Sequence, residues 1–332
     1  MTRLRRVSPA APGWTRRRSG RGFRYLDEAG RPLPAEDVER VKALVIPPAW
    51  REVWICPHPR GHLQATGVDA AGRRQYLYHP VWRQRRDELK FQRVATAARR
   101  LPTARRRIAA DLVLPDLPLQ RAAATAVRLL DLGAFRIGND YYADANGSFG
   151  LSTLERHHLS RSGDQLTFSF PGKSGIEHTV TIEDPLSVAA IEAMRTRRGS
   201  ARLFSYRGPA GWADLGSAHV NSYLAELFGG DFTAKDFRTW HATVLAARSL
   251  AITGPAPTPT ARKRAVRAAV VEVAGYLGNT PTIARASYVD PRVIDRYEGG
   301  TTIRDTLGRT GPERASQTAL ERAVLALLSE AE

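Results

Sequence analysis

Cysteine is nearly absent from this chain of 332 residues. Because Cys56 is the only one, no internal disulfide can form, and the sequence predicts a protein of a reducing compartment. Long apolar runs are missing as well. No stretch approaches the roughly 18 to 20 apolar residues of a membrane span, and the first residues lack the apolar segment of a secretory signal. We therefore expect a cytoplasmic protein with no membrane partner.

Acidic residues are too few to balance the basic ones. Lys and Arg number 50 against 33 Asp and Glu, which gives a formal net charge of +17 at pH 7. Such a charge favours a large polyanion as partner, and nucleic acid fits better than a small acidic substrate. Charge alone leaves a ribosome-associated or merely soluble basic protein as the alternative. Together with the expected compartment, it predicts a nucleoid-associated protein.

Composition divides the chain into three parts. Residues 1–22 contain RLRR and TRRRSGR and no acidic residue, which is typical of a basic arm. Residues 23–86 alternate short runs with turns rich in Gly, Pro and Asp, and predict an antiparallel sheet with a helix over 35–45. Residues 87–332 are mainly Ala- and Arg-rich helical segments. The expected fold class is α+β, with a small N-terminal antiparallel β-sheet domain and a larger, mainly α-helical domain.

Regular elements can be placed within these parts. Helical patterns cover residues 81–100, 117–132, 185–197, 216–228, 233–253, 260–277 and 313–330. The stretch QLTFSFPGKSGIEHTVTIED alternates apolar and polar residues on both sides of a turn, and predicts a β-hairpin with Lys173 at its tip. GVDAAGRRQ predicts a second hairpin, which places Tyr76 and Tyr78 on one face of the returning strand. LGNTPTIARASYVD is rich in small residues and looks loop-borne, so we expect Tyr288 to be mobile.

Separate segments of the large domain supply the residue types for one reaction. A phosphodiester under attack gathers negative charge, which arginine forks bind while remaining protonated. A lysine can protonate the leaving oxygen, an asparagine amide can donate to a non-bridging oxygen, and a tyrosine oxygen can act as nucleophile. The residues concerned are Arg136, Lys173, Arg238, Asn279 and Tyr288. They predict attack on a phosphodiester without a metal.

Five motifs, in this order, make the chain resemble the poxvirus-type and bacterial type IB DNA topoisomerases and, more distantly, the tyrosine recombinases. The motifs are GHLQATGVDAAGRRQYLYHP, RIGNDYY followed by GLSTL, GKSG, KDFRTWHAT and LGNTPTIARASYV. The resemblance implies that Tyr288 is the nucleophile and Lys173 the general acid. It makes Arg136 and Arg238 the phosphate clamp and Asn279 the fifth active-site residue.

The same resemblance implies an activity and a partner. The activity is relaxation of supercoiled duplex DNA through a 3′-phosphotyrosyl intermediate and religation, with no ATP, metal or small-molecule cofactor. The partner is duplex DNA, around which the two domains of a monomer close as a clamp. The matching groove-contacting strand carries side chains that can reach base edges and phosphates, namely Arg73, Arg74, Gln75, Tyr76 and Tyr78.

Other interpretations apply to these residues one at a time. Position 279 is Asn where many relatives carry His, so a role for a protonated imidazole does not carry over. Lys235 stands three residues before Arg238, where recombinases usually have His, which favours a topoisomerase. An architectural DNA-binding protein that shares the scaffold is the alternative from another class. CPHPRGH has no partner pair at zinc spacing, so we expect no metal site.

Overall fold

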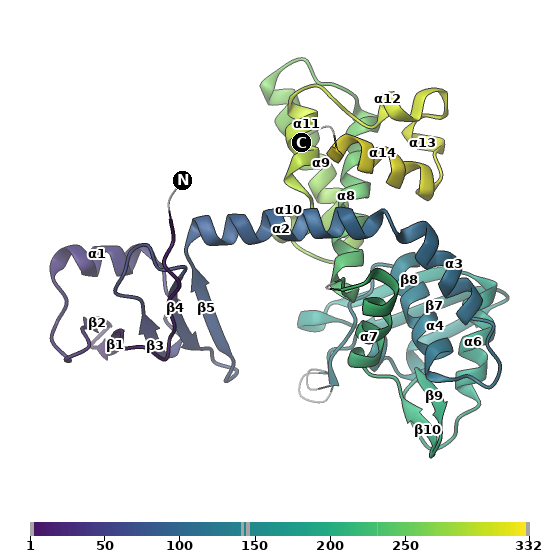
Figure 1. Ribbon diagram of the computed structural model, residues 1–332, viewed down its shortest axis with the longest axis horizontal. Helices are drawn as coiled ribbons and strands as arrows, with labels where there is room; N and C mark the ends of the chain where they lie inside the picture. Colours follow the sequence, from purple (N-terminus) through teal and green to yellow (C-terminus); the bar gives the residue numbers. More distant parts are fainter. Residues whose placement is uncertain (1–2, 141–142, 144–146, 231, 330–332) are drawn as a thin grey trace. The chain divides into compact units, whose positions relative to one another are not determined.

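The computed structural model describes residues 3–140, 143, 147–230 and 232–329. The chain divides into two compact units, Met1–Lys90 and Phe91–Glu332, which are described one at a time (Figure 1). Helix α2 (Pro80–Ala98) contains the division. Among the described helices, none combines the length and the apolar character that crossing a membrane requires.

The first unit is built on a five-stranded antiparallel sheet with the order β2-β1-β3-β4-β5. Its elements are β1 (Trp14–Ser19), β2 (Gly22–Leu26), α1 (Ala35–Ala43), β3 (Arg51–Ile55), β4 (Leu63–Val68) and β5 (Arg74–Tyr78). A small core of Leu33, Val41, Ile46, Val53, Ile55 and Ala65 holds helix and sheet together. The predicted small antiparallel sheet with a helix is confirmed.

Strand β1 departs from the expectation of a separate basic arm over residues 1–22. Trp14–Ser19 pairs with both β2 and β3, although the segment contains three consecutive arginines. The strand is possible because Arg16 donates hydrogen bonds to the carbonyl oxygens of Ile46 and Trp50, at 3.0 and 2.7 Å, while the arginines beside it are exposed. Backbone carbonyls thus take the place of acidic partners for this inward cation.

The second unit is mainly helical. Its helices are α3 (Leu101–Asp111), α4 (Leu119–Leu132), α6 (Pro185–Arg195), α7 (Ser217–Phe228), α8 (Ala234–Thr253), α9 (Pro259–Leu277), α10 (Pro281–Ser287), α11 (Pro291–Glu298), α12 (Arg304–Leu307), α13 (Gly311–Arg314) and α14 (Gln317–Ser329). Its strands are β6 (Leu159–Ser162), β7 (Gln165–Pro171), β8 (Glu177–Glu183), β9 (Ser205–Gly208) and β10 (Gly211–Asp214). The α+β class, the mainly helical second part and the hairpin β7–β8 are confirmed.

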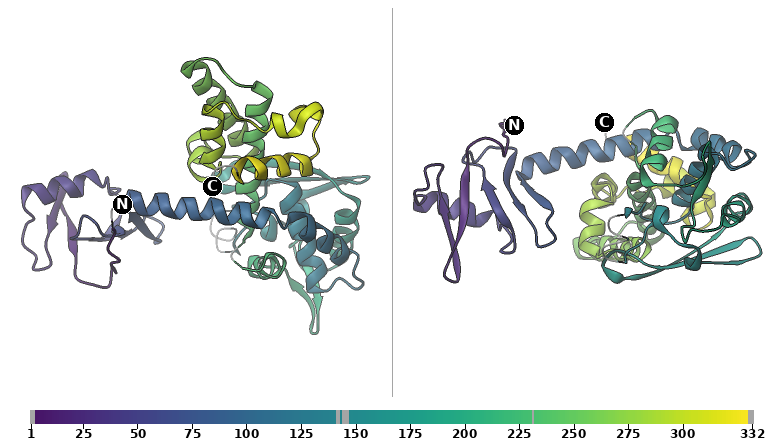
Figure 2. Two further views of the ribbon diagram at one scale, coloured as in Figure 1. Left: turned by 45° about the horizontal axis from the view of Figure 1, so that its top comes forward. Right: turned by 90° about the horizontal axis from the view of Figure 1, so that it is seen from below.

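The last predicted helix and the predicted hairpin of the second unit differ in detail from the structure. The helix expected over 313–330 is broken between α13 and α14, where the Ser316 hydroxyl accepts a hydrogen bond from the Ala319 N–H at 3.3 Å and begins a new helix. The hairpin is also part of a larger sheet with the order β6-β7-β8. Figure 1 and Figure 2 show this teal sheet beside α4 and α6, whereas α8, α9, α11 and α14, coloured green to yellow, gather together.

Helices α4 and α8 form the centre of the core. In α4, a run of small residues from Ala122 to Ala126 is fully buried, so neighbouring elements can approach its backbone closely. In α8, Phe237 and Trp240 are among the largest completely buried side chains. Helix α8 packs against α9, α11, α13 and α14, and it therefore carries its polar residues into a rigid interior.

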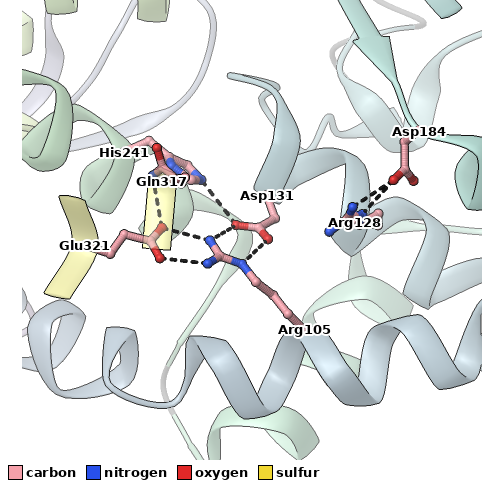
Figure 3. Close-up of polar contacts among 7 residues, drawn as sticks. All are labelled: Arg105, Arg128, Asp131, Asp184, His241, Gln317 and Glu321. Atoms are coloured by element: carbon pink, nitrogen blue, oxygen red, sulfur yellow. Dashed lines mark hydrogen bonds and ion pairs between the residues drawn. The ribbon is translucent and has the colours of Figure 1, made fainter. Parts of the chain in front are cut away.

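A network of ion pairs joins helices α3, α4 and α14 (Figure 3). The Arg105 guanidinium binds Asp131 at 2.7 and 2.9 Å and Glu321 at 2.7 and 2.8 Å. His241 of α8 lies 3.5 Å from the Asp131 carboxylate. Burial opposes ionisation of Asp131, but the hydrogen bonds from Arg105 outweigh it and hold the pKa of this carboxyl well below its usual range. Arg105 thus fixes two buried carboxylates at once.

We predict that Arg105→Met lowers the free energy of unfolding by about 3 kcal/mol or more, because it leaves two buried carboxylates without a cation. Denaturant unfolding at pH 7 measures the loss. Arg195→Met is the matched control: it removes an ion pair with Glu192 whose side chains are both 39% exposed. We expect this variant to cost less than about 1 kcal/mol, and equal losses in the two variants would contradict the role of the network.

The pH dependence gives a second measure of the same variant. Since the pKa of Asp131 is lowered by folding, its stabilising contribution is present above its ordinary pKa of 3.8 and is lost as the pH falls further. Without Arg105 the same carboxyl is buried without a cation, and protonation favours folding. The stability difference between wild type and Arg105→Met should therefore shrink as the pH falls below that value.

Candidate active site

Four of the five predicted catalytic residues come together in the second unit. Arg136 lies in the loop after α4, Arg238 in the first half of α8, Asn279 just after α9, and Tyr288 at the end of α10. The Arg136 guanidinium contacts Asn279 at 2.9 Å, and the Arg238 guanidinium carbon lies 5.4 Å from the centre of the Tyr288 ring. Lys173 is exposed in the turn between β7 and β8, without a hydrogen bond or ion pair to any residue that the structure describes.

Arg238 is a cation enclosed by the protein. Its residue is only 3% exposed, and the guanidinium donates to the carbonyl oxygens of Ala134 and, at 2.7 Å, Leu277. Burial, together with the nearby charge of Arg136, lowers the pKa of Arg238 to about 10, so it remains protonated at neutral pH. The buried Nε has no hydrogen-bond partner among the described residues.

Arg136 ties three segments of the site together. It donates to the Gly278 carbonyl at 3.1 Å and to Asn279 Oδ1 at 2.9 Å, and its other terminal nitrogen lies 3.2 Å from His178 Nε2. Burial lowers its pKa, while the neighbouring Tyr288 opposes that shift. The Asn279 amide nitrogen is buried without a partner in the described part of the chain. An unpaired buried donor is costly in a folded protein, so this nitrogen and the Arg238 Nε are suited to an anionic ligand.

Tyr288 follows a helix, and the expectation of a mobile loop is wrong for Pro281–Ser287. Pro281 occupies the first helical turn, and the Thr280 hydroxyl accepts a hydrogen bond from the Ile283 N–H at 3.3 Å. Tyr288 itself is half-buried and packs against the core. The fold therefore holds Tyr288 beside Arg238.

The backbone around Tyr288 is fixed to the helix that carries Arg238. The Thr243 hydroxyl lies 3.3 Å from the Tyr288 carbonyl oxygen and accepts a hydrogen bond from the Asp290 N–H at 3.1 Å. Thr243 and Asp290 are each 2% exposed. Because α8 holds both Arg238 and Thr243, the tyrosine and the arginine are kept in register by one rigid element.

The predicted DNA-contacting residues of the first unit divide between two environments. Arg74 and Tyr76 are exposed, and the rings of Tyr76 and Tyr78 stack with centres 6.1 Å apart. Arg73 and Gln75 instead bind the Asp69 carboxylate, at 2.8 and 2.9 Å. Hydrogen bonds from Arg73, the backbone N–H first, lower the pKa of Asp69 to about 2.

Sequence reasoning gave no role to His178, which contacts Arg136. Period-two alternation in β8 places His178 on the same face as Val180 and Ile182, which pack on the core, while the residues between them are exposed. The sequence feature that could have drawn attention to His178 is its place as a polar ring on the apolar face of a strand.

Metal ligands are not grouped in the part of the chain that the structure describes, where no three His, Cys, Asp or Glu side chains could share an ion. In the CPHPRGH segment, Cys56 is buried and its thiol donates to the His58 carbonyl at 3.4 Å. His62 Nδ1 accepts a hydrogen bond from the Val7 N–H at 3.2 Å. These groups are used within the fold.

Comparison with known families and proteins agrees with this architecture. The family described as "Eukaryotic DNA topoisomerase I, catalytic core" matches residues 79–305, and "Bacterial DNA topoisomerase IB, N-terminal domain" matches residues 22–69. DNA topoisomerase 1B of Acanthamoeba polyphaga mimivirus is 29% identical over 295 residues, which cover 86% of this chain and 88% of the relative. DNA topoisomerase I of Monkeypox virus is 23% identical over 237 residues, 69% of this chain and 71% of the relative.

Fold and family matches together define the class of protein. The chain has the catalytic core of a DNA topoisomerase I, and it is therefore an enzyme, an isomerase of DNA topology. With the matching N-terminal domain, it belongs to the type IB DNA topoisomerase family, and the resemblance of its motifs is confirmed.

We predict that Thr243→Val destabilises the protein by about 1 to 3 kcal/mol, because the buried Asp290 N–H loses its acceptor. Thr243→Ser is the matched control, since it keeps the hydroxyl and loses one methyl group at a cost of about 1 kcal/mol or less. Denaturant unfolding measures both variants. Equal stability of Thr243→Val and wild type would show that the hydroxyl does not hold this segment.

Proposed function

We propose that this enzyme relaxes supercoiled duplex DNA by cutting one strand through Tyr288, allowing rotation, and resealing the strand, with no need of ATP or a metal ion. One observation carries the assignment of the nucleophile: Tyr288 lies beside Arg238, whose buried cation has a donor without a partner. The family match supplies the class of reaction. The distinctive step is a 3′-phosphotyrosyl bond.

The reaction exchanges one phosphoester for another. The Tyr288 oxygen attacks the phosphorus and releases its proton to surrounding water, while the bond from phosphorus to the 5′ oxygen breaks. The 5′ oxygen takes a proton from Lys173, which leaves a free 5′-hydroxyl end. Religation runs the same steps in reverse, so the energy of the phosphodiester is kept in the tyrosyl ester.

The transition state carries extra negative charge on the non-bridging oxygens. Arg238 and Arg136 meet that charge with donors already in place, and the Asn279 amide donates to an oxygen without titrating. Lys173 begins outside this group, exposed in the β7–β8 turn, and approaches the leaving oxygen when DNA is bound. An asparagine at position 279 suffices because its task is hydrogen bonding.

Both units contribute to DNA binding in this proposal. Arg74, Tyr76 and Tyr78 present donors and aromatic rings on the exposed strand β5, while Asp69 orients Arg73 and Gln75. The enzyme acts as a monomer that closes around the duplex, and it works in the cytoplasm on the nucleoid. The net charge of +17 supports a polyanionic partner.

Plasmid relaxation tests the activity directly. We expect the purified protein to relax supercoiled plasmid in EDTA without nucleotide, because the tyrosyl ester conserves the bond energy. Agarose gels over a series of salt concentrations measure the topoisomers, since phosphate contacts make the optimum salt-dependent. Absence of relaxation at every salt concentration would overturn the proposed function.

Replacement of the nucleophile tests the role of Tyr288. We predict that Tyr288→Phe abolishes relaxation and formation of the covalent adduct while leaving duplex affinity intact, since only one hydroxyl is removed. Adduct is trapped with denaturant and resolved on a gel, and affinity is measured by fluorescence anisotropy. Tyr206→Phe is the control, a half-buried tyrosine on β9 whose ring contacts His219. Adduct formed equally by wild type and Tyr288→Phe would exclude Tyr288.

A further inference from the structure

The ring of His178 is a contact shared by three segments of the active site. It projects from β8, and its Nε2 lies 3.2 Å from the Arg136 guanidinium. Phe170, opposite it on β7, stacks on the ring with centres 5.7 Å apart. The half-buried imidazole thereby joins the Arg136 loop to the β7–β8 hairpin, which carries Lys173 at its turn.

Two glycines make room for this ring. A Cβ on Gly172 would lie 2.3 Å from His178 Cδ2, and a Cβ on Gly278 would lie 2.3 Å from Cε1. Each glycine directly precedes a proposed catalytic residue, Lys173 in one case and Asn279 in the other. Gly278 also has φ +59°, which closes α9 in a left-handed conformation. The ring therefore lies against the backbone of both segments.

We propose that His178 is a positioning residue for strand cleavage, which accepts a hydrogen bond from Arg136 and sets the spacing between Arg136, the Lys173 turn and the Gly278–Asn279 segment. This role rests on the proposed function of the site. It deepens that function because it assigns a group that never touches the phosphate and acts through Arg136. A histidine at this point holds a cation in place without neutralising it.

The contact requires a neutral imidazole. Arg136 has only donors, so Nε2 accepts and the proton resides on Nδ1. The charged groups that act on the ring include two cations, Arg136 and Arg238, and one anion, Glu177, the neighbour of His178 on β8. Burial first, and the two arginines next, lower the pKa of His178 below its ordinary value of 6.5. Protonation would remove the acceptor and add a third positive charge, so the contact persists at neutral pH and is lost in acid.

Two substitutions distinguish the effect of the hydrogen-bond acceptor on His178 from the effect of the volume of its ring. His178→Phe keeps a ring and has no acceptor, whereas His178→Gln offers an amide oxygen to Arg136. We expect His178→Phe to slow adduct formation on plasmid DNA at least about tenfold, since misplacing a charge-stabilising group costs rate steeply. We expect His178→Gln to stay within about threefold of wild type by the same reasoning. Duplex affinity, measured with Tyr288→Phe added to each variant, should stay unchanged.

The pH profile gives an independent readout that does not depend on the Phe variant. Adduct formation by wild type should fall below pH 6.5 as His178 is protonated, and His178→Gln should lack that fall. His219→Phe is the matched control, because His219 is also half-buried and accepts one hydrogen bond, from the Gly216 N–H at 3.1 Å. Its rate should match wild type.

Several results would overturn the role of His178. They are a His178→Phe rate within twofold of wild type, equal losses in the Phe and Gln variants, losses that parallel a lower melting temperature or weaker affinity, and an acid fall retained in His178→Gln. Wild-type relaxation is measured in the same series. If wild type relaxes plasmid and these results occur, only the inference on His178 fails, whereas an inactive wild type overturns the proposed function itself.

Discussion

A buried cation without a carboxylate is the constraint on which the candidate site depends. Arg238 is 3% exposed, and its described polar contacts are with two backbone carbonyl oxygens and the side chain of Tyr288. Carbonyl dipoles orient a guanidinium but do not neutralise it, so the charge remains available in a medium of low dielectric. Arg136 stands near enough to lower the pKa of Arg238 further. Both features leave the positive charge of Arg238 available to an anion.

The contrast with Arg105 shows that the chain holds its buried arginines in more than one way. Arg105 is also largely buried, but it binds two carboxylates, Asp131 and Glu321. Both carboxylates occupy the donors of this guanidinium, so Arg105 contributes to the architecture of helices α3, α4 and α14. Arg16 is a third solution, held by backbone carbonyls in a strand. Arg16 and Arg238 both bind backbone carbonyls, so the unpaired Nε and the neighbouring Tyr288 ring distinguish Arg238.

Sequence patterns predicted most elements, because periodicity and turn residues act locally. The helices of the second unit and the β7–β8 hairpin follow from them. Arg136, Arg238, Asn279 and Tyr288 were grouped instead by their chemistry and by the family resemblance, and the structure brings these four together. Sequence patterns failed where contacts with residues distant in sequence determine the local structure. The arginine run of β1 forms a strand because Arg16 donates hydrogen bonds to the backbone carbonyls of Ile46 and Trp50. These acceptors are distant in sequence, so the residues near Arg16 do not predict them. Helix α10 was not predicted, although Thr280 and Pro281 are residue types that commonly begin a helix. The many small residues of this segment suggested a loop instead.

Helix α8 explains why the site can be preformed around an uncompensated charge. Along this one buried helix, Arg238 faces the tyrosine ring, His241 approaches the Asp131 carboxylate, and Thr243 holds the backbone of Tyr288. A side chain on a rigid helix cannot relax toward water without disturbing the core on which Phe237 and Trp240 pack. The packing of that core therefore holds Arg238 in place. The Arg105 network supports the same helix, because Asp131 also contacts His241 of α8. Only a ligand, and not a rearrangement of the protein, can relieve the charge.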